Sequence, residues 1–172
     1  MQEANKIGSF EQAVLPHLDA AYNLARWLTR NEHDAEDVVQ EAYMRAFQFF
    51  AGFYGMDGRG WLLTIVRNTC YTWLRKNRAG ELSTPFDEEV HREEASSPNP
   101  EELFLKNADR QHLQDALEKL PLEFREALVL RELEGLSYKQ IADVTGVPVG
   151  TVMSRLARAR DRLKDALVRG VK

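Results

Sequence analysis

The chain has 172 residues, of which 44% are hydrophobic and 29% charged, so it can bury a core and still stay in solution. Cys70 is its one cysteine, which excludes a disulfide framework or a cysteine-based metal site within one chain. No apolar run approaches the roughly 18 residues of a membrane span and no basic-then-apolar leader opens the chain, so we expect a reduced, cytoplasmic protein without membrane insertion of its own.

The net charge of −4 is unevenly distributed. Residues 59–78 hold five basic and no acidic side chains, and residues 151–172 hold seven basic and two acidic ones. The remainder is acidic, with a net charge of −6 over residues 79–108. Two basic segments in an acidic chain indicate two phosphate-binding surfaces, while the acidic remainder should weaken non-specific DNA binding by the isolated protein. This pattern suits a DNA-binding protein that works inside a larger complex.

Apolar residues recur at helical spacing through the first 78 residues, and no stretch alternates as a strand would. A first stripe runs from 10 to 28, and Asp34 is predicted to cap a second helix. Residues 52–60 contain four glycines in nine and predict a loop before a third helix over 61–77. Trp27 and Trp73 are expected in the core. The three stripes comprise Phe10, Val14, Leu18, Ala21, Ala25 and Leu28; Ala35, Val38, Ala42, Ala46 and Phe49; and Leu62, Ile65, Val66, Thr69 and Trp73.

Helical periodicity stops at residue 80 and resumes near residue 103. Prolines, serines and an excess of acids between these points predict a flexible acidic linker. We therefore predict an all-α protein of two small helical domains, residues 1–79 and 103–172, joined by a linker over 80–102.

A helix-turn-helix is predicted near the C-terminus. Ser137 and Gln140 have the spacing of a capping box, the small Ala142 permits close helix approach, and Gly146 permits a tight turn. The following helix places hydroxyls and arginines in one row at spacings of three and four, near its N-terminus, where recognition helices enter the major groove. Taken alone, the row favours the solvated basic face of an ordinary helical hairpin. Together with the capping box, Ala142 and Gly146 it favours contact with DNA. Its members are Thr151, Ser154, Arg155, Arg158 and Arg162.

The run from 120 to 163, LPLEFREALVLRELEGLSYKQIADVTGVPVGTVMSRLARARDRL, resembles region 4 of the sigma-70 family in its small extracytoplasmic-function branch. The resemblance implies that this helix reads the −35 element of promoters. The implied −35 contacts are Lys139 and the five members of the row.

Residues 34–41, DAEDVVQE, resemble region 2.2 of the same family, which docks on the β′ clamp helices of RNA polymerase. Acidic and amide side chains beside valines suit a basic partner helix with an apolar centre. The alternative is a helix cap with a solvated face, which leaves the residues of the second turn unexplained. The implied contacts with core polymerase are Asp34, Asp37, Val38, Gln40 and Glu41.

Residues 61–78, WLLTIVRNTCYTWLRKNR, resemble regions 2.3 and 2.4, which melt and read the −10 element. Thr72 departs from the aspartate usual in the family. The loop aromatics before this helix would stack on an unpaired base, although Phe53 could instead anchor the loop to the core. The implied −10 contacts are Phe53, Tyr54, Trp61, Arg67, Asn68, Tyr71, Thr72, Arg75 and Lys76.

The resemblance implies a sigma factor that binds core RNA polymerase, through its β′ and β subunits, and promoter DNA, and that is held inactive by an anti-sigma factor. The acidic linker would thread the RNA-exit path and mimic RNA, or serve as a solvated tether. A stand-alone helix-turn-helix regulator is the main alternative, and it leaves residues 34–78 without a role. No nucleophile–base set, phosphate-binding glycine loop or metal-ligand spacing supports an enzyme, so we expect no catalysis, no metal and no cofactor.

Overall fold

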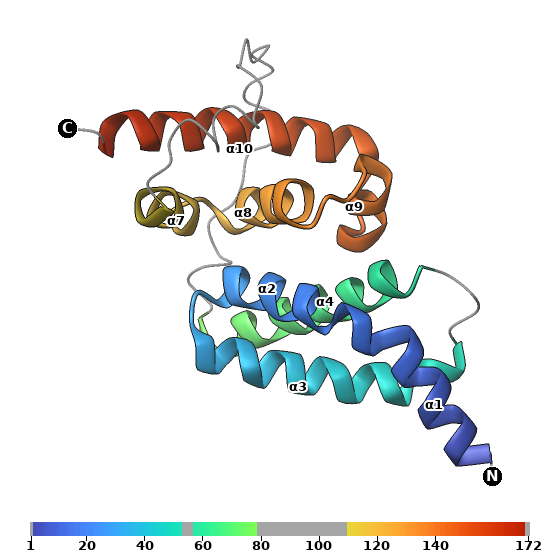
Figure 1. The fold of residues 1–172 in the computed structure, drawn as a ribbon. Coiled ribbons are helices and arrows are strands. Elements are labelled where there is room, and N and C mark those ends of the chain that lie inside the picture. The colour runs from blue at the N-terminus through green and yellow to red at the C-terminus, as the bar shows by residue number, and fades with distance from the viewer. Residues whose placement is uncertain (1, 53–56, 79–109, 171–172) are drawn as a thin grey trace. The chain divides into compact units, whose positions relative to one another are not determined.

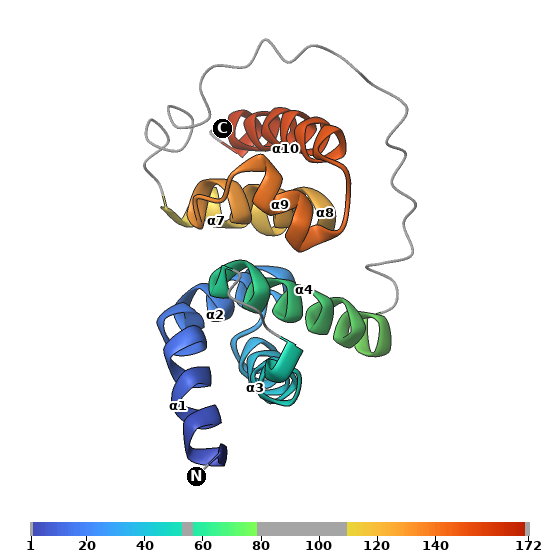
Figure 2. The same ribbon diagram turned by 90° about the vertical axis from the view of Figure 1, so that its right-hand side faces the viewer.

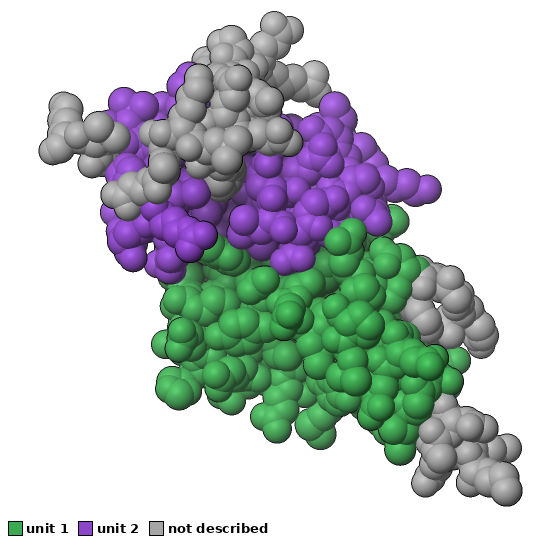
Figure 3. Space-filling model, viewed as in Figure 1, with its two compact units in different colours: residues 1–82, 143–146 green, residues 83–142, 147–172 purple. Residues whose placement is uncertain are grey.

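The computed structural model describes residues 2–52, 57–78 and 110–170, and the elements in these ranges are helices without strands (Figure 1). This confirms the all-α prediction. Contacts divide the chain into two compact units, residues 1–82 with 143–146 and residues 83–142 with 147–172 (Figure 3). The predicted linker, 80–102, and both predicted domain boundaries lie outside the described residues, so they stay predictions. Helices α1 to α4 are called the N-terminal bundle below, and helices α7 to α10 the C-terminal bundle.

The N-terminal bundle consists of α1 (Gln2–Val14), a 3-10 turn (Leu15–His17), α2 (Leu18–Thr29), α3 (Glu32–Gln48), a second 3-10 turn (Phe50–Gly52) and α4 (Gly58–Asn77). Helices α2, α3 and α4 pack against one another, as Figures 1 and 2 show from two sides. The predicted first stripe is divided between two helices, because Pro16 has no backbone N–H and its ring obstructs a continuous helix.

Small and branched apolar side chains form the core of this bundle. Most members of the predicted stripes are fully buried, while Phe49 at the end of α3 is 60% exposed and Trp27 and Trp73 are only half-buried. The aromatic ring of Phe10 fixes α1 to the end of α3, with edge-on contacts to Tyr43 and Phe47 at centroid distances of 5.1 and 5.2 Å. The core prediction is therefore correct for most of the aliphatic residues, although Leu18 and Ile65 are only half-buried. It is wrong for these three aromatic residues.

Helix α4 begins three residues before the predicted start, inside the glycine-rich segment. Its cap is Asp57, whose side chain accepts a hydrogen bond from the Arg59 N–H at 3.1 Å. A Cβ atom at Gly58 would lie 2.6 Å from the Ala13 carbonyl oxygen, so only glycine allows α4 to start so close to α1. This glycine serves helix packing rather than a loop.

The C-terminal bundle consists of α7 (Arg110–Glu118), α8 (Leu122–Leu128), a π-helical turn η3 (Val129–Leu133), α9 (Tyr138–Thr145) and α10 (Val149–Gly170). The long helix α10 packs along α7 and α8. Arg125 is buried and donates to the carbonyl oxygens of Glu118 and Leu120 at 3.2 and 2.8 Å, which satisfies the end of α7. Pro121 directly precedes α8, where its missing backbone N–H costs no helical hydrogen bond.

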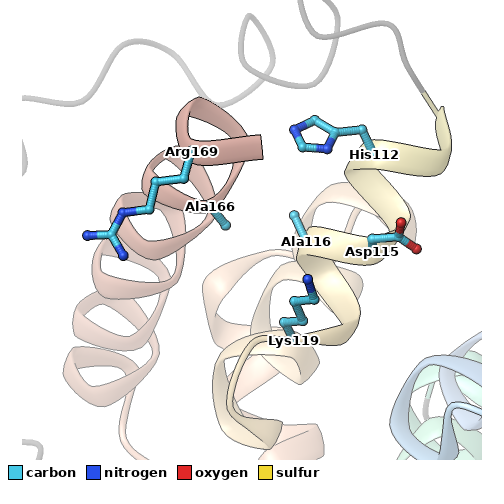
Figure 4. A pocket seen from close by; sticks show the side chains of 6 residues that line it. All are labelled: His112, Asp115, Ala116, Lys119, Ala166 and Arg169. Carbon is cyan, nitrogen blue, oxygen red and sulfur yellow. The ribbon is translucent and has the colours of Figure 1, made fainter. Parts of the chain in front are cut away.

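Helices α7 and α10 also border a hollow of about 450 Å³ at the C-terminal end of α10 (Figure 4). His112 closes one side of it with a hydrogen bond between its Nε2 and the Leu167 carbonyl oxygen, 3.0 Å apart. The hollow is lined by His112, Asp115, Ala116, Lys119, Ala166 and Arg169.

Candidate nucleic-acid interface

The predicted capping box forms at the start of α9. The Ser137 Oγ accepts from the Gln140 N–H at 3.1 Å, and the Gln140 side chain accepts from the Ser137 N–H at 2.8 Å. Gly135 and Gly146 have φ angles of 69° and 74°, which allow the chain to turn before and after α9. The predicted helix-turn-helix is therefore present, with α9 as its first helix and α10 as its second.

The predicted DNA row lies on the flank of α10 beside its buried face, which consists of Val152, Leu156, Ala159, Leu163 and Leu167. Four members, Thr151, Ser154, Arg155 and Arg158, are half-buried, which matches a flank rather than the most exposed face. Arg162 is exposed, and its guanidinium lies 5.1 Å from the ring centroid of Phe124 on α8. Lys139 is exposed in the first turn of α9. The structure thus brings the row together and ties its last member partly to α8.

Two charged contacts hold the helix-turn-helix against the preceding turn, and sequence reasoning missed both. The Arg131 guanidinium donates to the Leu136 carbonyl oxygen at 2.9 Å and lies 4.7 Å from the ring centroid of Tyr138. Arg160 donates to Glu132 at 3.1 Å, and their side chains are only 16% and 14% exposed. Helical periodicity gives no sign of a pair 28 residues apart, so the sequence alone shows Arg160 only as part of the basic excess.

The predicted polymerase-binding residues of α3 divide into three groups. Asp37, Gln40 and Glu41 are exposed, and Glu41 also pairs with Arg45 at 3.2 Å. Val38 is fully buried, so its prediction as a contact residue is wrong: its side chain packs in the core that α2, α3 and α4 share.

Asp34, in the third group, is not the cap of α3, because Asn31 precedes the helix and its side chain accepts from the Asp34 N–H at 3.0 Å. The Asp34 carboxylate instead accepts from the Arg78 guanidinium at 2.7 Å. Arg78 also donates to the Thr29 carbonyl oxygen and lies 5.2 Å from the ring centroid of Trp73. The ends of α2 and α4 are thereby tied to the start of α3.

A shallow hollow of about 400 Å³ lies between α2 and α3 beside the exposed residues Gln40 and Met44. Its walls are mostly apolar and aromatic. The sequence does not reveal this hollow, because its walls come from two helices that only the fold brings together. It is lined by Leu18, Tyr22, Glu36, Val39, Gln40, Tyr43 and Met44.

The predicted −10 residues of α4 form a polar edge beside the buried face. The Arg67 guanidinium stacks on the ring of Tyr71 at 3.7 Å and donates to Asn68 Oδ1 at 3.4 Å. The Thr72 hydroxyl donates to the Asn68 carbonyl oxygen at 3.0 Å. Of the other residues in this set, Arg75 and Lys76 are exposed, Trp61 is half-buried, and Phe53 and Tyr54 lie outside the described residues.

The described residues contain no group of three or more histidine, cysteine, aspartate or glutamate side chains placed to hold a metal ion. No described helix combines the length and the apolar character that a membrane crossing requires.

Comparisons with known proteins match both bundles to one family. Residues 13–80 match sigma-70 region 2, and residues 110–163 match sigma-70 region 4. The sigma-E factor of Haemophilus influenzae, an extracytoplasmic-function (ECF) sigma factor, is 33% identical over 155 residues, which cover 84% of this chain and 79% of that protein. The chain belongs to the ECF sigma factors.

Another ECF relative is SigE of Mycolicibacterium smegmatis, 38% identical over 94% of this sigma factor. The matched residues span 62% of the mycobacterial protein's length. The sigma factor RpoE of Bartonella quintana, solved in complex with the anti-sigma factor NepR, is 31% identical with a TM-score of 0.71 and coverage of 93% of this chain and 97% of that chain.

Proposed function

We propose that this sigma factor binds core RNA polymerase, recognises the −35 and −10 elements of its promoters and opens the DNA for transcription initiation. The observation that carries the proposal is the presence of both sigma regions on one chain, each built as a helical bundle with a basic helix. A stand-alone helix-turn-helix regulator would use the C-terminal bundle alone and leave the N-terminal bundle without a role.

The −35 contact is assigned to α10. Arginine can donate two hydrogen bonds to guanine, and hydroxyls and further arginines can hold phosphates. Thr151, Ser154, Arg155 and Arg158 supply these groups from the first turns of the helix, where recognition helices meet the base edges. Lys139 in the first turn of α9 and Arg162, the last member of the row on α10, suit phosphate contacts, since both are exposed.

The −10 contact is assigned to the polar edge of α4. Stacking on Tyr71 and the bond to Asn68 hold the Arg67 guanidinium in one orientation, which lowers the entropy lost on binding a phosphate or a base. Arg75 and Lys76 add positive charge near the end of the helix. Aromatic residues of the preceding loop, Phe53 and Tyr54, would stack on an unpaired base.

Binding to core polymerase is assigned to Asp37, Gln40 and Glu41 of α3, which are exposed on one flank. The hollow beside Gln40 extends this surface with apolar walls, as a partner helix with basic and apolar side chains requires. The protein would act in the cytoplasm without catalysis of its own. An anti-sigma partner is proposed from the likeness to the RpoE–NepR structure.

In vitro transcription with core RNA polymerase and a library of promoters tests the function. We expect initiation only when this protein is added, and weak duplex binding by the protein without polymerase. A stand-alone regulator would give the opposite result: tight duplex binding alone, and no initiation with core enzyme.

A further inference from the structure

Met153 is an exposed apolar residue near the start of the predicted recognition helix. It follows the buried Val152 in the second turn of α10, and its side chain is 53% exposed. Single exposed apolar side chains are common on protein surfaces, so exposure by itself implies no contact. The exposure of Met153 is informative because of its position in the helix-turn-helix, beside the predicted DNA-contacting row.

Gly150, Met153, Ser154 and Ala157 lie at spacings of three and four, which places them on one outward face of α10 beside the arginine flank. Gly150 has no positive φ, and a Cβ atom built on it meets nothing within 4 Å. Neither the backbone nor packing within the bundle requires glycine there. A position without a side chain next to Met153 lets the wall of a DNA groove approach the helix closely.

Each base pair shows hydrogen-bonding groups in the major groove, and among the four bases only thymine adds an apolar group, its C5 methyl. Ser154 and the arginines supply polar contacts, whereas methionine offers a flexible apolar chain with no donor. We propose that Met153 contacts the methyl group of a thymine in the −35 element and so sets a preference for thymine at that position. This inference rests on the proposed −35 function of α10.

Deoxyuridine tests the contact, because it differs from thymidine only by the missing methyl group. The −35 element is first selected from a randomised library by the wild-type protein bound to core RNA polymerase. Each thymine on either strand is then replaced singly by deoxyuridine, and holoenzyme binding is measured. We expect one replacement to weaken wild-type binding about three- to fivefold, as burial of one methyl group implies.

With Met153→Ala, the unmodified promoter should bind about three- to fivefold more weakly, and the same deoxyuridine should have no further effect. Met153→Leu should still bind the deoxyuridine promoter more weakly than the unmodified one. Val168→Ala, at a 65% exposed site farther along α10, should bind both promoters as wild type does. Equal deoxyuridine effects in wild type and Met153→Ala, or none in wild type, would overturn the inference. If the wild-type protein selects no promoter with core polymerase, the proposed function itself fails.

Discussion

Arg78 shows how one basic side chain can serve the fold although its segment has the charge of a DNA-binding surface. It contributes to the five positive charges of residues 59–78, yet its guanidinium is directed at Asp34 and the Thr29 carbonyl oxygen. Both side chains of the ion pair are about three-quarters buried, with exposed fractions of 27% and 25%. Charge-assisted bonds in such surroundings stabilise more than exposed ion pairs do.

We expect Arg78→Ala to lower the free energy of unfolding of the N-terminal bundle by about 1–2 kcal/mol, because two hydrogen-bonded groups lose their donor. Urea unfolding followed by tryptophan fluorescence measures this, since Trp27, Trp61 and Trp73 all belong to that bundle. The matched control is Arg75→Ala, an exposed arginine one turn earlier, which should change the free energy by less than about 0.5 kcal/mol. Equal effects of the two substitutions would show that the Arg78 contacts add nothing.

Substitutions at neighbouring residues of α3 should affect either the stability of the bundle or its affinity for polymerase, but not both. Val38→Ala removes buried methyl groups and should cost about 1–2 kcal/mol of stability. Asp37→Arg combined with Gln40→Ala changes exposed groups only, so the melting temperature should stay near wild type while the affinity for core polymerase falls. Co-purification with core enzyme and thermal unfolding measure the two effects. Unchanged co-purification of the double variant with core enzyme would contradict the assignment of α3 to the polymerase interface.

At the scale of helices, the sequence predicted which segments are helical better than where the helices begin. Asn31 and Asp34 are both good cap residues three positions apart, and only the backbone shows that Asn31 is the cap. The early start of α4 depends on Gly58 meeting α1, a contact between segments that periodicity does not describe. Val38 matched both the apolar stripe and the motif for polymerase contact, and its complete burial shows that it is a core residue. By contrast, the capping box was predictable because its two hydrogen bonds are local.

Two glycines at the helix-turn-helix should respond oppositely to alanine. Gly146 has a φ of 74°, where a Cβ atom is strained, so Gly146→Ala should destabilise the C-terminal bundle by about 1–2 kcal/mol. Gly150 is helical and meets open space, so Gly150→Ala should leave stability unchanged or raise it by up to about 1 kcal/mol. Native-state hydrogen exchange of the α9 and α10 amides measures both changes. A loss of protection with Gly150→Ala would reveal a structural need for that glycine.

At the scale of the molecule, the proposed function requires the two bundles to reach promoter elements that lie far apart. Elements separated by about 17 base pairs lie about 58 Å apart along the duplex, at about 3.4 Å per pair. A linker of about 22 residues spans about 25 Å as a relaxed coil and about 75 Å when fully extended. The proposed function therefore requires the linker to be stretched on polymerase.

Deleting ten residues within 81–97 should abolish transcription from promoters that need both elements, because the limit of extension falls to about 40 Å. Binding to core polymerase through α3 should persist, as co-purification would show. Replacing the same ten residues with glycine and serine keeps the length and removes acidic charge. Full activity of this second variant would support a tether, and loss of its activity would support a role for the negative charge. Normal transcription by the deletion variant would contradict bridging of the two elements.

A stretched linker also pulls on the bundle to which it is attached. Arg78 is the last described residue before the predicted linker, and it is bound to groups at the end of α2 and the start of α3. We therefore expect tension that enters at Arg78 to be shared among α2, α3 and α4 instead of separating α4 from its C-terminal end. Under a pulling force, we expect the Arg78 contacts to resist separation of α4 from the N-terminal bundle and so to keep the proposed −10 surface of α4 in place.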